Sequence, residues 1–126
     1  MKKRLWMVLS MVVVMMVVSP LMFAETQTYP SPIEAGPNIY NKIFENERIQ
    51  VSEIKFNPGD QIAMHTHKGE HLVYILEAGT LELSYPDGQT KTVEGKVGQV
   101  MWMPAESHAA RNIGTTTLRA LIVEFK

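Results

Sequence analysis

Apolar and polar positions alternate in short runs from residue 39 to the end of the chain, and turn residues separate the runs. Alternation over four to eight residues is typical of strands that bury one face. The sequence Pro86-Asp87-Gly88 predicts a hairpin turn, because proline presets the first turn dihedral and glycine accepts the positive one. The pattern predicts strands over residues 48–56, 61–67, 71–77, 80–85, 89–94, 99–103, 107–113 and 117–125.

Strands at this spacing predict an all-β fold, either a barrel or a sandwich of two sheets. The sequence shows no long amphipathic helix and no internal repeat, so residues 48–126 are expected to form a single barrel domain. The segment before them, residues 25–47, is rich in Thr, Ser and Pro in its first half. Because no sustained apolar period runs through that half, we expect an extended N-terminal arm there.

The first 24 residues have the layout of a secretory signal peptide. A basic start at residues 2–4 is followed by an almost wholly apolar run at residues 5–18, and cleavage is expected after Ala24. Met22 stands where the cleavage motif prefers a small residue, so retention of the segment as a membrane anchor stays open. The protein is expected to be exported, to the periplasm or outside the cell, without membrane attachment after cleavage.

The mature chain carries a mildly negative charge. Removing residues 1–24 takes away three of the 12 basic residues and none of the 13 acidic residues. Nucleic acids and anionic membranes attract basic surfaces, so neither is an expected partner. The chain contains no cysteine, so it has neither a disulfide nor a thiolate ligand. Its stability must come from packing, with a bound metal as a further source.

All four histidines of the chain fall in two short clusters, with His65, His67 and His71 in the first and His108 in the second. Imidazole nitrogens are common ligands of Zn, Fe, Cu and Ni. Residues i and i+2 of a strand point to the same face about 6.6 Å apart, so His65 and His67 are expected to face one point inside the barrel. A turn after His67 allows His71 to begin the next strand on the same face. The sequence therefore predicts a metal site formed by all four histidines.

Two-residue alternation also predicts the neighbours of this site. Val73 and Ile75 are expected inside the barrel in the strand after the first cluster, and Ala110 and Asn112 in the strand that holds the second. Asn112 is expected to hold the following segment through side-chain hydrogen bonds, either supporting a ligand from behind or stabilising a turn.

Other side chains near the clusters carry further hypotheses. Glu70, beside the first cluster, is the candidate general base, and no other acid or base stands out. Met64, Met101 and Met103 fit either soft copper ligands or ordinary packing, and packing is preferred because methionine fills irregular cores.

The order and spacing of these residues resemble the two motifs of the cupin superfamily, over a stretch from about residue 48 to residue 125. The resemblance implies a double-stranded β-helix, or jelly-roll barrel, that holds a divalent metal at the positions of the four histidines. It also implies homodimers formed through the outer strands. The first motif is carried by Gly59, His65, His67, His71 and Gly79, and the second by Gly98, Pro104, His108 and Asn112.

The chain departs from this pattern in its ligands. The usual first motif has a glutamate where this chain has His71, so three histidines and one carboxylate become four histidines. Glu70 lies one residue early, and giving it the carboxylate role would turn Val73 and Ile75 outward, so we prefer His71. In the second motif Glu106 replaces a glycine. Four neutral ligands would leave the full charge on the metal and draw an anionic ligand strongly.

The leading functional hypothesis is an exported, metal-dependent enzyme that acts on a small molecule, with an anion favoured. Its reaction is expected to be either dioxygenase-like or a Lewis-acid isomerisation. The metal is expected to be Fe, Mn, Zn, Ni or Cu, and its identity stays open. The alternative from another class is a module that binds metal, or a ligand through metal, without turnover. A barrel that metal only stabilises is a third hypothesis.

Overall fold

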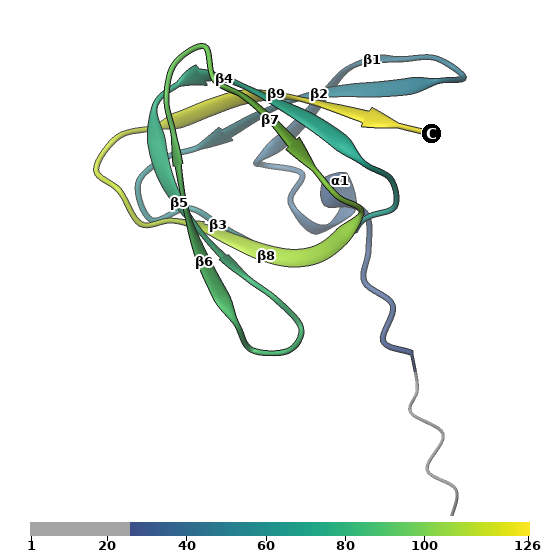
Figure 1. Ribbon diagram of the computed structural model, residues 1–126, viewed down its shortest axis with the longest axis horizontal. Coiled ribbons are helices and arrows are strands. Elements are labelled where there is room, and N and C mark those ends of the chain that lie inside the picture. The colour runs from purple at the N-terminus through teal and green to yellow at the C-terminus, as the bar shows by residue number, and fades with distance from the viewer. Residues whose placement is uncertain (1–25) are drawn as a thin grey trace, which may run out of the picture.

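The structure, a computed structural model, describes residues 26–126, so the expected signal peptide lies outside the described residues. Two antiparallel sheets face each other and enclose the core (Figure 1). No helix among residues 26–126 is long and apolar enough to cross a membrane. The elements of this range are α1 (Pro32–Ala35), β1 (Tyr40–Glu45), β2 (Ile49–Phe56), β3 (Gln61–His67), β4 (His71–Glu77), β5 (Gly79–Ser84), β6 (Thr90–Gly95), β7 (Val100–Met103), β8 (Glu106–Asn112) and β9 (Leu118–Phe125).

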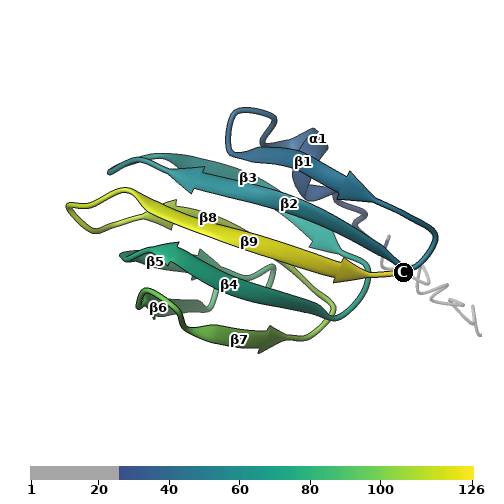
Figure 2. The same ribbon diagram turned by 90° about the horizontal axis from the view of Figure 1, so that it is seen from above.

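Strands that are distant in the chain pair with one another in a nested series. β2 pairs with β9, β3 with β8, β4 with β7 and β5 with β6, all antiparallel. The chain thus forms one long hairpin rolled into a barrel, with sheet orders β1-β2-β9-β4-β7 and β3-β8-β5-β6. Figure 2 shows β2, β9, β4 and β7 side by side in one layer. This architecture is a jelly roll, and it confirms the predicted all-β barrel.

The tip of the long hairpin is the turn between β5 and β6. Gly88 has φ +85°, a conformation that glycine adopts without steric cost. Its N–H donates to the Tyr85 carbonyl at 2.9 Å, and the Gln89 N–H donates to Asp87 Oδ1 at 2.9 Å. These bonds confirm the turn predicted at Pro86-Asp87-Gly88.

Burial along β4 and β8 follows the predicted two-residue alternation. In β4 the buried positions are His71, Val73 and Ile75. In β8 they are His108, Ala110 and Asn112. Both strands therefore carry a histidine and apolar core residues on the same inner face.

β3 departs from strict alternation. Ile62 pairs with Ala110 and His65 pairs with His108, so two residues of β3 stand opposite one residue of β8. Such a bulge adds one residue to a strand and resets which side chains point inward. Ile62 and His65 are both buried although three positions separate them, which an unbroken period of two does not give. One half of β3 thus faces the apolar core and the other half the histidine cluster.

A short helix and a strand lie within residues 32–45, which corrects the expectation of an extended arm over residues 25–47. The Ser31 side chain accepts a hydrogen bond from the Glu34 N–H, and the Glu34 carboxylate accepts one from the Ser31 N–H. This capping box begins α1 with Pro32 in its first turn. β1 then pairs with β2 at the edge of the sheet. Only Tyr40 of its six residues is buried, so β1 carries almost no hydrophobic alternation that would reveal it.

Candidate metal centre

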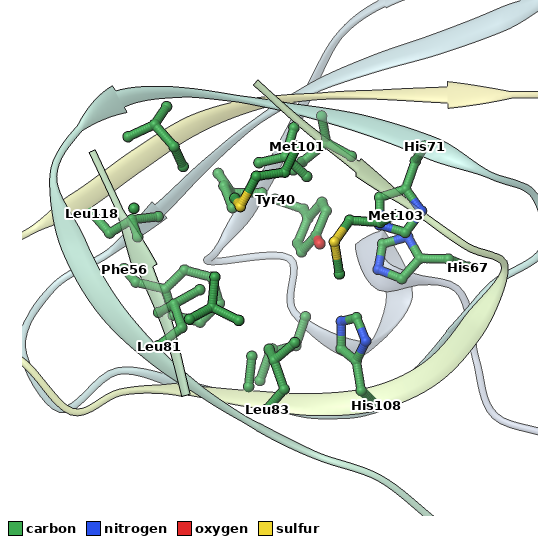
Figure 3. A pocket seen from close by; sticks show the side chains of 18 of the residues that line it. Tyr40, Phe56, His67, His71, Leu81, Leu83, Met101, Met103, His108 and Leu118 are labelled. Atoms are coloured by element: carbon green, nitrogen blue, oxygen red, sulfur yellow. The ribbon is translucent and has the colours of Figure 1, made fainter. Parts of the chain in front are cut away.

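Four buried imidazoles lie together at one end of the barrel interior. β3 supplies His65 and His67, β4 supplies His71 and β8 supplies His108, and none of the four is more than 6% exposed. They line a cavity of about 70 Å³ whose other end is apolar (Figure 3). Histidines from distant parts of the chain therefore converge inside one barrel, as the alternation predicted.

Three of the imidazoles form a compact set of donors. Ring nitrogen atoms of His65, His67 and His108 lie within 4.8 Å of one another. The Nε2 atoms of His65 and His67 are 3.2 Å apart. Two nitrogen ligands at 2.0–2.1 Å from a tetrahedral ion lie about 3.4 Å apart. The spacing of this pair therefore suits two ligands of one metal ion.

His71 has a different arrangement from the other three. Its ring stacks on that of His67, with centroids 4.1 Å apart and an interplanar angle of 17°. Its nitrogen atoms do not belong to the group within 4.8 Å. Its Nδ1 lies 3.4 Å from the Gly69 carbonyl, a longer contact than those of the other rings. His71 faces the cavity, as predicted, and flanks the three-histidine set.

The three clustered rings are each held from behind at Nδ1. A carbonyl or an ionised carboxylate can only accept a hydrogen bond, so Nδ1 carries the proton in each ring and Nε2 keeps a lone pair. Metal-binding histidines usually have this arrangement. The donations run from His65 to the Ala63 carbonyl at 2.8 Å, from His67 to Glu124 Oε1 at 2.8 Å and from His108 to Glu106 Oε1 at 3.0 Å.

The Nε2 lone pairs of the clustered rings require a positive charge between them. Two of them, on His65 and His67, face each other at 3.2 Å inside the protein. Such a contact is repulsive unless a proton or a metal cation lies between the atoms. A proton serves one pair of nitrogens, whereas a metal ion serves all three. The donor set therefore fits a divalent metal ion, with His65, His67 and His108 as the residues that would hold it.

Burial keeps three of the four imidazoles in the neutral form that can bind metal. It lowers the pKa of His65 and of His71 to about 4. Burial, together with the charges of the neighbouring imidazoles, lowers the pKa of His108 to about 3. Neutral imidazole is the ligand form, so these three rings need lose no proton to bind a metal near neutral pH.

Two glutamates behind the rings were not predicted from the sequence. Glu124 lies in β9, which is beside β4, and its other oxygen accepts from Gln50 Nε2 at 3.3 Å. Glu106 lies two residues before His108 in β8, a same-face spacing that was available as a signal. Burial raises the pKa of Glu106. The two carboxylates add negative charge behind His67 and His108, so the four histidines do not act as a purely neutral set.

The structure also places two other residues that the sequence analysis singled out. Glu70 is exposed and does not line the cavity, so its role as general base has no structural support. Asn112 is buried, but its hydrogen bonds go to the Phe56 and Thr116 carbonyls and to the Gly114 N–H. Asn112 therefore stabilises the turn after β8, which is one of its two expected roles, and it pairs across the sheet with Leu81.

Two of the three methionines lie beside the site and have the preferred packing role. Met101 and Met103 line the cavity, and Met64 does not. Met103 pairs across the sheet with His71. Both lining residues are also packed against the apolar core, in agreement with the packing role.

Comparison with known proteins gives the class defined by this jelly roll and its histidines. The sequence profile of the family described as "Cupin domain" matches residues 52–124. The chain therefore belongs to the cupin family. No curated protein is significantly similar in sequence.

Solved structures resemble the protein in the same way. A cupin domain from Bordetella pertussis Tohama I is 26% identical, with a TM-score of 0.65, over 79% of this chain and 98% of that one. The polyketide cyclase RemF from Streptomyces resistomycificus is 27% identical, with a TM-score of 0.53, over 68% of this chain and 63% of that one. A cupin superfamily protein from Desulfitobacterium hafniense DCB-2 shares the fold. It is 18% identical, with a TM-score of 0.53, over 69% of this chain and 75% of that one.

Proposed function

We propose that this cupin is a metal-dependent enzyme that acts on a small molecule. The observation that carries the proposal is the convergence of three Nε2 lone pairs, on His65, His67 and His108, at the wall of a buried cavity. When bound, a divalent ion of Fe, Mn, Ni, Cu or Zn would supply Lewis acidity or, for the redox-active metals, reaction with O₂. The residues of the chain supply the ligands, fix their orientation and exclude bulk water.

A site with three histidine ligands favours an enzyme over a protein that holds its metal in a closed, four-ligand site. Structural metal sites usually take four protein ligands, whereas catalytic sites take three and leave a position for water or substrate. His71, stacked beside the set, is proposed as a fourth ligand only in a state where its ring leaves His67. RemF, described as a polyketide cyclase, shows that an enzyme occurs among the structural neighbours. Dioxygenase-like chemistry and Lewis-acid isomerisation are the two proposed reactions.

The experiment begins with metal analysis of protein purified without a histidine tag. Elemental analysis should find about one divalent ion per chain. O₂ uptake and product isomerisation are then measured with small thiols, β-diketones and catechols, before and after chelation. Loss of turnover on chelation, with recovery on adding back the native metal, supports the proposal. Turnover that survives complete removal of metal would exclude it.

A metal-binding module without turnover is the second candidate. It is favoured by the lining of the cavity, where the only titratable groups among the described residues are the four histidines and Tyr40. No carboxylate among residues 26–126 lines the cavity to move a proton. Metal bound in full stoichiometry, together with no reaction across the panel, would support this candidate.

Export is proposed on the signal-like sequence of residues 1–24. Expression with a periplasmic fractionation and intact-mass measurement tests it. Cleavage after Ala24 gives a chain that begins at Glu25, and a full-length mass in the membrane fraction would indicate a retained anchor.

A homodimer is proposed on the outer face of β4 and β7. Val100 and Trp102 are more than half exposed there, and Tyr74 pairs with Val100. The Trp102 ring lies 5.3 Å from that of Phe125, so the aromatic surface continues onto β9. Because a two-fold contact buries the same apolar patch on both copies, a second copy of this chain is the proposed partner. Light scattering should show a dimer that Trp102→Lys converts to a monomer.

A further inference from the structure

Among the described residues that line the cavity, one hydrogen-bond donor has no partner. Its lining is apolar except for the four histidines, Tyr40 and the weakly accepting sulfurs of Met101 and Met103. The Nδ1–H groups of His65, His67 and His108 are already used by acceptors behind the rings, and that of His71 points toward the Gly69 carbonyl. Among the described residues, the Tyr40 O–H is the donor left to serve a molecule in the cavity.

The position of Tyr40 places this hydroxyl at the histidine end. The ring meets that of His65 edge-on at 6.1 Å and lies 6.4 Å from that of His67. Figure 3 shows the Tyr40 oxygen on the side of the cavity where Met103 and His67 lie. Burial raises the pKa of Tyr40 above its usual value, so the phenol keeps its proton near neutral pH.

The fold does not need this hydroxyl. The Tyr40 side chain is 7% exposed, and its oxygen makes no hydrogen bond to any of residues 26–126. Among residues 26–126, only the Ser52 Oγ is a fully inaccessible side-chain oxygen or nitrogen without a hydrogen-bond partner. The Tyr40 oxygen also lacks a partner but is not in that class, so it is accessible from the cavity. A phenylalanine would pack equally well in a core that asked only for an aromatic ring.

The rest of the cavity limits what can occupy it. Its far end is walled by apolar side chains that include Phe56, Leu81 and Leu118 (Figure 3). Its volume of about 70 Å³ is about half of the 150 Å³ in which a protein cavity holds benzene. No lysine or arginine is among the described lining residues, so an anionic group would be neutralised only by the metal. The space suits an occupant with one polar end and a short aliphatic chain.

We propose that Tyr40 donates a hydrogen bond to the oxyanion of a short-chain aliphatic carboxylate or enolate whose apolar part enters the far end of the cavity. This inference rests on the proposed function, because the metal held by the histidines supplies the positive charge at that oxyanion. Tyr40 selects an oxygen acceptor, and the apolar wall selects a short aliphatic chain over an aromatic ring. The substrate class is thereby narrowed to small aliphatic oxyanions.

The test uses the full chain loaded with Co²⁺, with propionate as the probe. Co²⁺ binding is measured first, by its visible absorption and by elemental analysis, in the native protein, Tyr40→Phe and Tyr85→Phe. Tyr85 is a matched control because its ring lies 6.2 Å from that of His108 although the residue does not line the cavity. All three proteins should bind Co²⁺ equally. Propionate titrated into the visible spectrum should then bind about tenfold more weakly to Tyr40→Phe and equally to Tyr85→Phe.

A second measurement needs only the native protein. Affinity should rise about fourfold per added methylene from acetate to propionate, and benzoate should bind more weakly than propionate. Should Tyr40→Phe fail to fold, this series still tests whether the apolar end of the cavity takes a short aliphatic chain. Equal propionate affinity in native protein and Tyr40→Phe, or benzoate binding as tightly as propionate, would overturn the inference and leave the metal site intact. Failure of the native protein to bind Co²⁺ or another divalent ion at all would overturn the proposed function instead.

Discussion

The two ends of the barrel interior are built by the same strands but obey different physical rules. At the apolar end, Phe56, Ile75 and Leu118 are at most 2% exposed, and their burial requires only close packing of apolar side chains. At the other end, the four imidazoles are 1–6% exposed, and each needs an acceptor at Nδ1 and a partner at Nε2. The difference shows that one end supplies stability, whereas the other holds a set of groups that is costly to bury without a bound ion.

The strands connect these two ends directly. β8 carries Ala110 into the core and His108 into the cluster, and β4 carries Ile75 and His71 in the same way. A substitution at one end should therefore change mainly the property that this end supplies. The effects of substitutions at the two ends on the free energy of unfolding are expected to add, because residues without shared contacts act nearly independently.

The largest expected effect is that of His108→Ala on metal binding. Loss of one of three ligands should weaken metal affinity by more than the 10–100-fold that loss of a hydrogen-bond partner behind a ligand costs. The metal-free variant should keep the native circular dichroism spectrum, because the apolar end is unchanged. Competition with a chromophoric chelator measures the affinity. Unaltered affinity would remove His108 from the site.

Phe56→Ala should show the reverse pattern at the apolar end. Truncation of a buried phenylalanine typically costs 3–5 kcal/mol of unfolding free energy, because apolar area is lost and a cavity remains. Urea unfolding of the metal-free protein measures this cost, and metal affinity of the folded variant should change little. Phe125→Ala is the matched control, since Phe125 is 41% exposed and its removal should cost far less.

The stability of the metal-free protein should depend on pH because of the histidine end. The folded pKa values of His65, His71 and His108, about 4, 4 and 3, lie below the ordinary value of 6.5. Below pH 6.5 the unfolded chain binds protons that the folded chain refuses, so stability is full above 6.5 and falls toward pH 4. The loss should reach a few kcal/mol, since each pKa unit corresponds to about 1.4 kcal/mol.

Urea unfolding at several pH values between 8 and 4 tests this dependence. In His108→Asn, whose new side chain cannot be protonated, the free energy of unfolding should change less steeply with pH over the same range. A stability that stays constant from pH 7 to pH 4.5 in the native sequence would contradict the buried, neutral state of the cluster.

Glu124→Gln should have a smaller effect, again confined to the histidine end. The substitution keeps the shape but removes the charge behind His67, and such a change typically lowers metal affinity 10–100-fold. Glu70→Gln is the matched control, because Glu70 is exposed and does not line the cavity. Equal affinities in the two variants would show that the contact between Glu124 and His67 does not tune the ligand.

The smallest expected effect on metal affinity is that of His71→Ala. The His71 nitrogens lie outside the group of three, so affinity should fall less than tenfold, well below the loss in His108→Ala. The same chelator competition compares the two variants side by side. A loss as large as that of His108→Ala would show that His71 leaves its stacked position on His67 and becomes a ligand.

Features that depend on local alternation were predictable from the sequence. The inner faces of β4 and β8, the turn at Gly88 and the convergence of the histidines follow from a two-residue period and from turn chemistry. β1 was not, because at the edge of the sheet it buries only Tyr40. That omission also hid the hydroxyl that faces the histidine end of the cavity.

Features that depend on pairing between distant strands were not predictable. Glu124 in β9 reaches His67 in β3, a strand of the opposite sheet, and no local pattern encodes this contact. The bulge in β3 likewise appears only when β3 is laid against β8. Alternation alone assigns Ile62 and His65 to opposite faces, so the strand was predicted correctly and its inner face only in part.

The bulge at Ala63 and Met64 affects the hydrogen bonding of His65 more than the direction of its side chain. Deleting Ala63 would restore an unbroken pleat in which Ile62 and His65 both still point inward, so the extra residue is not required to aim the histidine. The bulge does determine which carbonyl accepts from His65 Nδ1, because the bond runs to Ala63, a residue within the bulge. A shortened β3 would keep the direction of His65 but would remove the acceptor that now fixes the proton on its Nδ1.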